Sequence, residues 1–351
     1  MDLEKLFRNH LSLWIRETGA EGDTVLSSRV RLARNLLDTK FTAVASVQEM
    51  EQVLTLVEET LPKLKRDLTL IRLAEVDSLS RQELVEKHLI SPEHAENPQT
   101  KGVVVNPDED ISIMINEEDH LRIQVIKAGL SLKDTYELAN QLDDELEELI
   151  PIAFSPKYGY LTSCPTNVGT GLRVSVMLHL PALVALGQID RVSTVCSKLG
   201  LVIRGLYGEG SASAGDIFQI SNQITLGSSE SEIISHLQAV AEQIIEEERK
   251  ARQALLEGRE GEIEDHVYRA LGLLTYARKL DSNEAMTLLS KVKLGIDLGL
   301  IKSLDSVIMK ELMVITRSAV LQKIMGSSLT PEERDNKRAV VIREWIAHFT
   351  K

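Results

Sequence analysis

Five arginines of this sequence fall on segments with the alternating pattern of β-strands. Arg29 and Arg31 share one side of Thr24–Arg34, and the apolar Val30 and Leu32 share the other. The remaining three are Arg122, Arg173 and Arg204, each in or beside a later strand pattern. A forked guanidinium makes paired, charge-assisted bonds to phosphate oxygens. The chain has no GxxxxGK[ST] loop and no HRD…DFG pair, so convergence of these arginines is the way it would hold ATP. The alternative is that each arginine is a solvated strand residue with a carboxylate partner.

The acidic segment Asn116–Arg122 (NEEDHLR) follows an apolar alternation that ends at Ile115. If the strand continues, alternate residues share one face, namely Asn116, Glu118, His120 and Arg122. Glu118 and Arg122 would then lie about 13 Å apart, at roughly 3.3 Å per residue. That spacing suits a carboxylate and a phosphate-binding arginine at opposite ends of a two-substrate site. The alternative is a charged turn that ends the strand. The spacing of ligands and glycine does not fit a calcium-binding EF-hand loop.

The segment Ser163–Arg173 (SCPTNVGTGLR) carries a cysteine beside two glycines. Gly169 and Gly171 permit tight turns and close approach of the backbone to a ligand. Cys164 could be a thiolate tuned by nearby arginines, or else a buried structural cysteine. A cysteine protease is a weaker interpretation, because no histidine partner stands out. Cys196, on a helical pattern, is expected to be a buried structural residue.

The elements that would position these residues predict an α+β fold with a largely antiparallel sheet flanked by helices. The strand patterns are Thr24–Arg34, Val103–Val105, Ile111–Ile126, Tyr160–Ser163, Arg173–Leu180, Leu201–Gly205 and Ile217–Ile224. An amphipathic helix is expected over Val47–Leu64, ending near Pro62. Beyond Ser228 only helical periods remain, beginning with Ser229–Leu256. The predicted division is an N-terminal helical segment (1–23), a catalytic domain (24–257) and an all-helical C-terminal domain (258–351).

Composition limits the classes of function. Among 351 residues, 43% are hydrophobic, 26% are charged and the formal net charge is −13, which argues against a broad nucleic-acid-binding surface. Aromatic residues make up only 4%, so a base-stacking platform is not expected. Two cysteines allow neither a disulfide framework nor a four-cysteine zinc site. No signal-peptide pattern and no run of 18 apolar residues occur. A cytoplasmic protein with reduced thiols, bound neither to membrane nor to nucleic acid, is therefore expected.

Taken in order, these motifs resemble the catalytic domain of the phosphagen (ATP:guanidino) kinases. The matching segments are LSSRVRLAR, LVEKHLISP, INEEDHLR, LTSCPTNVGTGLR, and VIRGLYGEG with ISNQ. Within that family, the chain is similar to the bacterial protein-arginine kinases of the McsB type. Its late run Arg334–Ala339 (RDNKRA) resembles their RDxxRA phosphoarginine pocket.

The resemblance implies roles for individual residues. Nucleotide contacts would come from Ser27, Ser28, Arg29, Val30, Arg31, His88, Arg122, Arg173, Val174, Ser175, Val176, Met177, Arg204, Gly205, Leu206, Tyr207, Gly208 and Glu209. Glu118 would be the catalytic base, Cys164 would contact the acceptor guanidinium, and Glu209 is a candidate second acidic contact. Arg334, Asp335, Arg338 and Ala339 would form an allosteric phosphoarginine pocket. Mg²⁺ would be held mainly by ATP phosphates and water, with no metal site in the protein. Tyr207 stands where arginine kinases carry an arginine.

The resemblance further implies an enzyme that phosphorylates arginine side chains in proteins. Only Met1–Asp23 precedes the SSRVR strand, whereas the small-substrate enzymes carry a whole helical domain there. An uncovered site would admit a protein side chain. The implied partners are an activator protein, the Clp protease machinery and a heat-shock repressor, in a stress-response and quality-control setting, with a homo-oligomer expected. Two alternatives remain: a small-molecule guanidino kinase, and a non-catalytic adaptor that binds phosphoarginine.

Overall fold

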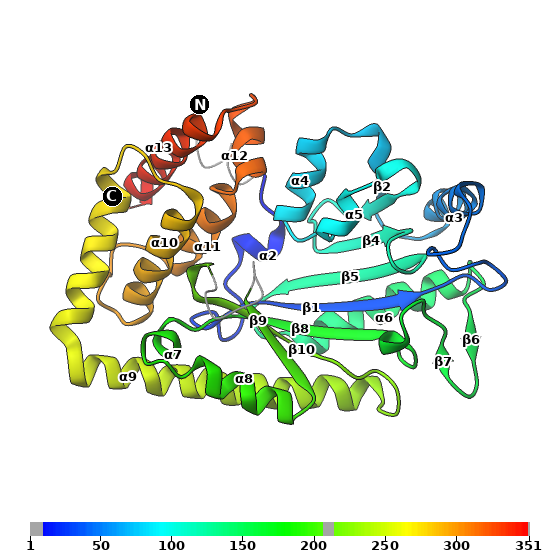
Figure 1. Ribbon diagram of the computed structural model, residues 1–351, viewed down its shortest axis with the longest axis horizontal. Coiled ribbons are helices and arrows are strands. Elements are labelled where there is room, and N and C mark those ends of the chain that lie inside the picture. The colour runs from blue at the N-terminus through cyan, green and yellow to red at the C-terminus, as the bar shows by residue number, and fades with distance from the viewer. Residues whose placement is uncertain (1–9, 206–213, 350–351) are drawn as a thin grey trace.

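A single antiparallel sheet forms the centre of the first two thirds of the chain in the computed structural model, which describes residues 10–205 and 214–349 (Figure 1). Within those ranges it has eight strands in the order β2-β3-β4-β5-β1-β8-β10-β9. They are β1 (Val25–Arg34), β2 (Thr69–Arg72), β3 (Gly102–Val105), β4 (Ile111–Ile115), β5 (Leu121–Ala128), β8 (Leu172–His179), β9 (Leu201–Gly205) and β10 (Ile217–Asn222). Every neighbouring pair is antiparallel, so the predicted α+β class with a largely antiparallel sheet is confirmed.

Helices flank this sheet and form most of the described chain beyond it. They are α2 (Leu13–Arg16), α3 (Val47–Thr60), α4 (Ser78–Glu86), α5 (Pro92–Ala95), α6 (Leu132–Glu147), α7 (Pro181–Ala185), α8 (Ile189–Lys198), α9 (Glu230–Tyr276), α10 (Ser282–Asp297), α11 (Ser306–Ile315), α12 (Ser318–Met325) and α13 (Pro331–Phe349). The helix α3 begins with a capping box between Ser46 and Glu49 and gives way to a 3₁₀ turn at Leu61–Lys63, which contains Pro62. No helix in the described part is long and apolar enough to cross a membrane.

The central strand β1 separates two chemically different faces of the sheet. Val30 and Leu32 are fully buried on one face, which packs against helices such as α6. Arg29 and Arg31 lie on the other face, because successive side chains of a strand point to opposite sides. The alternation predicted for this segment is therefore present.

Two predicted strands are shorter than expected. The pattern Tyr160–Ser163 yields only β7 (Gly159–Tyr160), which pairs with β6 (Phe154–Ser155) in a separate two-stranded sheet. The pattern Ile111–Ile126 is interrupted between β4 and β5, with consequences for the site described below.

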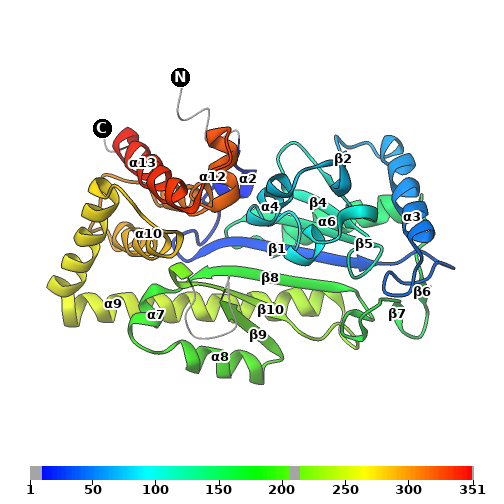
Figure 2. The ribbon, with the colours of Figure 1, turned by 45° about the horizontal axis from the view of Figure 1, so that its top comes forward.

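The helix α9 joins the sheet to the helical part of the molecule. It continues past the predicted end at Leu256 as far as Tyr276, so the predicted boundary between 257 and 258 falls inside a helix. Figures 1 and 2 show two arms of α9 that meet at an angle where the colour passes from yellow-green to yellow. The helix contains Gly258 and Gly261 in its interior, and glycine is among the residues at which helix bends commonly occur. The first arm contacts β8 and β10, and α9 also packs against α10 and α13.

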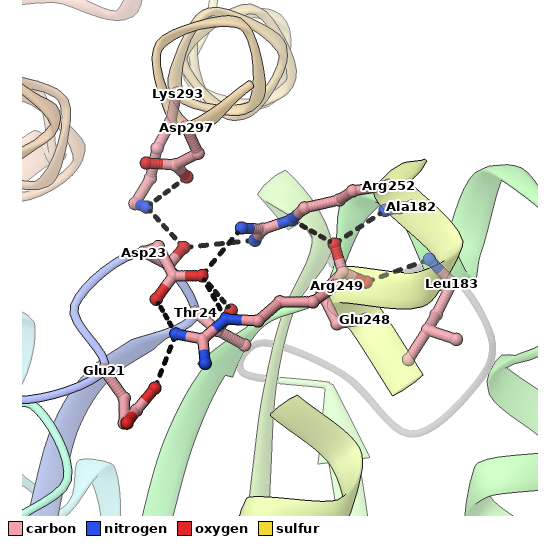
Figure 3. A network of polar contacts seen from close by, with 10 residues as sticks. All are labelled: Glu21, Asp23, Thr24, Ala182, Leu183, Glu248, Arg249, Arg252, Lys293 and Asp297. Atoms are coloured by element: carbon pink, nitrogen blue, oxygen red, sulfur yellow. Dashed lines mark hydrogen bonds and ion pairs between the residues drawn. The ribbon is translucent and has the colours of Figure 1, made fainter. Parts of the chain in front are cut away.

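A partly buried ionic network fixes the junction of these parts (Figure 3). Asp23, just before β1, accepts hydrogen bonds from Arg249 and Arg252 of α9 at 2.6 and 3.1 Å, and its carbonyl oxygen accepts one from Lys293 of α10. Glu248 of α9 accepts the two leading backbone N–H groups of α7, those of Ala182 and Leu183, at 3.1 and 3.0 Å. The N-terminal segment, the sheet and the helical region are therefore fastened to one another by charge as well as by apolar packing.

Candidate active site

Five arginines from four strands line one cavity of about 550 Å³, a size typical of ligand sites, which span roughly 300–1,000 Å³. They are Arg29 and Arg31 of β1, Arg122 of β5, Arg173 of β8 and Arg204 of β9. The strand register explains the convergence, because directly opposed residues of antiparallel strands point to the same face. Arg31 is opposite Arg173, and Ala33 is opposite Arg122. Placing two like charges directly opposite one another destabilises a sheet, which points to a binding function.

The charges in this cavity are poorly compensated. Burial, followed by the neighbouring charges of Arg173 and Arg122, lowers the pKa of Arg29 to about 10. Burial and the same cluster lower the pKa of Arg31 well below its ordinary value. The pKa of Arg173 is lowered by burial and then by Arg204 and Arg122. A bound anion would relieve this mutual repulsion.

Hydrogen bonding leads to the same conclusion. The guanidinium of Arg29 donates to neutral groups, Gln219 Oε1 at 2.6 Å and Ser175 Oγ at 3.3 Å. The buried Nε groups of Arg31 and Arg173 have no hydrogen-bond partner among the described residues. Buried donors in a native protein are normally satisfied, so these two are available to phosphate oxygens. Among the residues that the structure describes, the alternative of surface arginines with carboxylate partners fits only Arg122, which contacts Glu117 and Glu118.

Arg34, the last arginine of β1, shows what a structural arginine looks like in this protein. It lies on the opposite face from Arg29 and Arg31 and is 3% exposed. Its Nε and Nη2 bond both carboxylate oxygens of Asp143 in α6, and its guanidinium lies 3.3 Å from the ring centre of Tyr160. It is therefore satisfied within the fold.

His88 marks one end of the cavity. Its backbone has a φ of 62°, and its carbonyl accepts a hydrogen bond from Gln124 Nε2 at 2.8 Å. Burial, followed by the charges of Arg29 and Arg317, lowers the pKa of His88 to about 3, so the ring is neutral at neutral pH. The rings of His88 and Trp14 lie 5.9 Å apart. Beside them, Ser27, Ser175 and Met177 line a small void against the sheet.

Several residues expected to contact nucleotide, some of them through backbone rather than side chain, are not among those that line the arginine cavity. The side chains of Val30, Val174 and Val176 are fully buried in the core on the other face of the sheet. Ser28 is buried and donates to the carbonyl oxygen of Gly129 at 2.8 Å. Gly205 ends β9 opposite Phe218. Leu206, Tyr207, Gly208 and Glu209 lie outside the described residues.

Glu118 lies on a hairpin turn, so the strand does not continue through Asn116–Arg122, and the alternative of a charged turn that ends the strand is confirmed. The strand β4 ends at Ile115, and Asn116 adopts a φ of 60°, which asparagine tolerates better than most residues. Its backbone N–H donates to the carbonyl of His120 at 2.9 Å and closes the turn. Glu118 and Arg122 are therefore not about 13 Å apart: Glu118 Oε2 lies 3.0 Å from Arg122 Nη2.

The other two residues expected on the same face anchor the hairpin. The side-chain amide of Asn116 donates to the carbonyls of Met50 and Thr100. The ring of His120 is buried, accepts the backbone N–H of Leu36 at Nδ1 and lies 2.9 Å from the Lys40 carbonyl at Nε2. Neither side chain is among those that line the arginine cavity.

Asp119 joins the Glu118 turn to the cysteine segment. Its Oδ1 accepts hydrogen bonds from Asn35 Nδ2 at 2.6 Å and from the backbone N–H of Ser163 at 2.7 Å. Asn35 in turn accepts the backbone N–H of His120 at 2.9 Å. The sequence patterns missed Asn35 and Asp119, although a buried acid beside an exposed one in NEEDHLR is a signal that could have been followed.

Cys164 is partly buried on the segment that Asp119 holds. Its Sγ lies 3.0 Å from Thr166 Oγ1, and Asn167 Nδ2 donates to Glu118 Oε2 at 3.4 Å. Because Asn167 lies on the Cys164 segment and Glu118 also bonds Arg122, these contacts connect the segment to the arginine cluster. Cys196 is 1% exposed within α8, as expected for a structural cysteine.

The glycines of the cysteine segment serve the chain rather than a ligand. Gly169 has a φ of 110°, and a Cβ there would lie 2.5 Å from the Thr225 carbonyl oxygen. Gly171 has a φ of 63°, and a Cβ there would lie 2.7 Å from the Ala33 carbonyl oxygen. The close backbone approach that these residues permit is therefore to neighbouring segments of the protein.

The run Arg334–Ala339 lies on α13, where its members differ in exposure. Arg338 is 1% exposed, and it donates to the carbonyls of Thr316 and Leu280 and to Asp335 Oδ1. Arg334 is partly exposed and donates to the Leu329 carbonyl at 3.1 Å, and Ala339 is buried. Arg338 thus joins α13 to the ends of two other helices, while Arg334 and Asp335 remain partly accessible.

Three further residues of the site were missed in the sequence patterns. Glu117 bonds Arg122 Nη1 at 2.7 Å, Trp14 packs beside His88, and Arg317 lines the arginine cavity from the helical region. Glu117 stands next to Glu118 in the motif and could have been included. Nothing in the local sequence around Trp14 or Arg317 indicates proximity to the sheet.

Comparison with known proteins agrees with this geometry. A family model described as ATP:guanido phosphotransferase, C-terminal catalytic domain, matches residues 49–251. A second, described as protein-arginine kinase McsB C-terminal domain, matches residues 260–351. A protein-arginine kinase from Desulforamulus reducens is 52% identical over 349 residues, covering 98% of this chain and 98% of that protein. One from Halothermothrix orenii is 51% identical over 344 residues, covering 98% of this chain and 99% of that protein.

Solved structures extend the likeness. A lombricine kinase matches with a TM-score of 0.59 and 26% identity over 69% of each chain. The duplicated taurocyamine kinase from Schistosoma mansoni matches with a TM-score of 0.61 and 24% identity, over 76% of this chain and 39% of that one, which is a likeness of fold alone. From its arginine cavity, its sheet and its relatives over nearly the whole length, this chain belongs to the protein-arginine kinase family of ATP:guanido phosphotransferases.

Proposed function

We propose that this protein transfers the γ-phosphoryl group of ATP to arginine side chains of other proteins. The observation that carries the proposal is the convergence of five strand arginines on one cavity, with Glu118 in contact with one of them, Arg122. The cavity supplies an anion site with unsatisfied donors, and Glu118 beside it, with Cys164 on the segment bonded to the Glu118 turn, supplies groups suited to a guanidinium.

The arginines hold the nucleotide phosphates. Arg29 donates its hydrogen bonds to neutral groups, and the Nε groups of Arg31 and Arg173 have no partner among the described residues. These donors can therefore bind phosphate oxygens without first breaking ion pairs. Mg²⁺, held mainly by the nucleotide phosphates and water, adds charge neutralisation on the phosphate oxygens when bound. Most of the catalysis is then positioning and electrostatic stabilisation of the transferring group.

Glu118 is the base. An arginine guanidinium is protonated, with a pKa above about 12, and is a poor nucleophile until it shares or loses a proton. The described side-chain contacts of Glu118 involve Oε2, held by Arg122 and Asn167, which leaves Oε1 to accept a guanidinium proton. As that proton moves to Glu118, the nitrogen forms the new bond to phosphorus, and the bond from phosphorus to the ADP oxygen breaks.

Cys164 orients the acceptor from the other side. Asp119 ties the Cys164 segment to the Glu118 turn through the backbone N–H of Ser163, so the proposed positions of the two groups are held relative to one another. A thiolate there stabilises a second nitrogen of the guanidinium. The predicted second acidic contact from Glu209 is retained as part of this proposal.

A protein side chain is the acceptor. Glu118 is 43% exposed, so a guanidinium carried on another polypeptide reaches it without a separate entry path. A small-molecule guanidino kinase is the second candidate. In that case free arginine would be phosphorylated at least as efficiently as arginine within a protein. We place the reaction in the cytoplasm, where ATP is available.

One experiment tests both the reaction and the acceptor. The purified chain is incubated with Mg-ATP and either a generic unfolded protein or free arginine, and products are located by mass spectrometry under non-acidic conditions. Phosphoarginine in the protein is expected, with little turnover of free arginine. Efficient turnover of free arginine would favour the small-molecule enzyme, and phosphate in neither acceptor would favour the non-catalytic adaptor.

Regulation by product is proposed for α13. Arg334 and Asp335 offer a partly accessible cation and anion, which suit the phosphate and the guanidinium-derived end of phosphoarginine, with Arg338 and Ala339 behind them. Arg334→Ala with Asp335→Ala should abolish any activation by added phosphoarginine while nucleotide affinity is kept. If wild type and the double variant bind phosphoarginine equally tightly, Arg334 and Asp335 do not form the phosphoarginine site.

The proposed setting is protein quality control and the stress response. A homo-oligomer, an activator protein, a Clp protease and a heat-shock repressor are the proposed partners. Affinity capture with a purified candidate of each class, with and without ATP, would test them one at a time.

A further inference from the structure

One side of the arginine cavity is contributed by the helical region. Arg317 is the N-cap residue of α12, and its partly exposed side chain lines the same cavity as the five strand arginines. The residue comes from the part of the chain beyond the sheet, which the catalytic-domain model matching residues 49–251 does not include.

Contacts from two directions fix the backbone around Arg317. On one side, the buried carboxylate of Glu86, at the end of α4, accepts the backbone N–H groups of Ala319 and Val320 at 2.8 and 2.9 Å. On the other side, Arg338 Nε donates to the carbonyl of Thr316 at 2.9 Å. The position of the Arg317 side chain over the cavity is therefore a consequence of helix packing rather than of a loose loop.

Arg317, Arg29 and His88 line the same cavity. The charges of Arg29 and Arg317 add to burial in lowering the pKa of His88 to about 3, as expected if both guanidinium groups lie near the His88 ring. By the family resemblance, His88 would pack beside the adenosine portion of the nucleotide. Arg317 also acts on Glu86, whose pKa is raised by burial and held down in part by that positive charge. Neutralising Glu86 is thus the simplest structural explanation for Arg317, and a test must separate it from ligand binding.

We infer that Arg317 is a sixth phosphate-binding arginine, supplied by the helical region, which contacts the part of the nucleotide phosphate chain nearest the nucleoside. The inference rests on the proposed function, because it needs a nucleotide in this cavity. Two of its consequences follow from linkage. Nucleotide binding strengthens the packing of α12 on α4, and anything that shifts α12 alters nucleotide affinity by the same factor.

The test compares Arg317→Gln with a matched control from the same helix. Lys323 of α12 also reaches α4, donating to Ser80 Oγ at 2.6 Å, but it does not line the cavity. Calorimetry with the full-length chain gives the dissociation constants of Mg-ADP and adenosine. Loss of one charge-assisted contact should weaken Mg-ADP binding about tenfold in Arg317→Gln, whereas Lys323→Gln should remain within about twofold of wild type. Adenosine affinity should not change, because adenosine has no phosphate.

Other outcomes would overturn the inference. If Arg317→Gln binds Mg-ADP as tightly as wild type and only its melting temperature falls, Arg317 is a partner of Glu86 and nothing more. Equal losses in both variants would assign the effect to packing of α12, and an equal loss for adenosine would assign the contact to the nucleoside. If Arg317→Gln does not fold, Arg317→Lys keeps the charge without the fork and should bind Mg-ADP about threefold more weakly. If wild type itself binds no nucleotide, the proposed function fails instead.

Discussion

Two clusters of charge in this protein follow opposite rules. In the junction of Figure 3, each cation drawn has a carboxylate within hydrogen-bond distance: Arg249 with Asp23, Arg252 with Glu248, and Lys293 with Asp297 at 2.7 Å. In the cavity, Arg29 bonds neutral groups, and buried donors of Arg31 and Arg173 are unsatisfied among the described residues. The charged groups of the junction are paired without a ligand, whereas the buried donors of the cavity would be satisfied only when an anion binds. Paired buried charges therefore identify structure here, and unpaired ones identify a binding site.

The largest effect is expected outside either cluster, at the base. Glu118→Gln keeps shape and removes the proton acceptor, so the turnover rate should fall by roughly 10²–10⁴-fold. Mg-ADP affinity should stay within a few-fold of wild type, since the arginines are untouched. Phosphoarginine formation followed by mass spectrometry measures the first, and calorimetry measures the second. A variant that retains activity within a few-fold of wild type would exclude Glu118 as base.

The junction should respond in stability rather than in activity. Arg252→Ala leaves the fully buried Glu248 without its ionic partner, and breaking a buried pair typically costs about 3–5 kcal/mol of unfolding free energy. Arg249, whose side chain is 45% exposed, is the matched control, and its replacement by alanine should cost under about 1 kcal/mol. Denaturant unfolding without ligand measures both. Similar losses in the two variants would mean that burial does not decide the strength of this network.

Substitutions in the cavity should affect nucleotide affinity rather than stability. Arg31→Met removes one of two like charges that face each other across β1 and β8, so stability without ligand should hold or rise. Mg-ADP affinity should fall by about ten- to a hundredfold, as expected for lost charge-assisted hydrogen bonds. If Arg31→Met instead unfolds as readily as Arg252→Ala with unchanged nucleotide affinity, the contrast between the two clusters is wrong.

The smallest effect is expected from the thiols. Cys164→Ser should lower activity about tenfold, as for one lost interaction with the transition state, and Cys196→Ser should leave it nearly unchanged. A thiol-alkylating reagent should inactivate wild type, and ATP with protein substrate should protect it. Peptide mapping would show which cysteine reacts. Equal sensitivity of the two serine variants would remove the special role given to Cys164.

The sequence was informative where a local rule determines the outcome. Alternation placed Arg29 and Arg31 on one face, because the side-chain period of a strand is fixed by geometry. The same rule failed at Asn116, where a left-handed backbone conformation ended the strand and brought Glu118 beside Arg122. Asparagine before a run of charged residues was compatible with a turn, but alternation alone cannot say where pairing stops.

Other features depended on contacts between distant segments, which no local pattern contains. Tertiary packing produces the hydrogen bond between Ser163 and Asp119, and it places Arg317 in the cavity beside the strand arginines. Burial of Arg338 is a further example, because its spacing from Arg334 on a helix gives a shared face but not the carbonyls that surround it. The helix α9 exceeded its predicted length because the chain runs through Gly258 and Gly261 without leaving the helical conformation.

The bent helix α9 also constrains how proteins of this architecture can vary in length. Each residue of an α-helix adds about 100° of rotation and about 1.5 Å of rise. Glu248 caps α7, and Val267 is buried where α9 meets α10. Inserting or deleting one residue between them would rotate the helices beyond α9 about the axis of α9, relative to the sheet. Arg317 would then swing away from His88, although no residue of the cavity had changed. We therefore expect related chains to keep the number of residues in this interval fixed, or to change it by whole helical turns, while loops elsewhere vary freely.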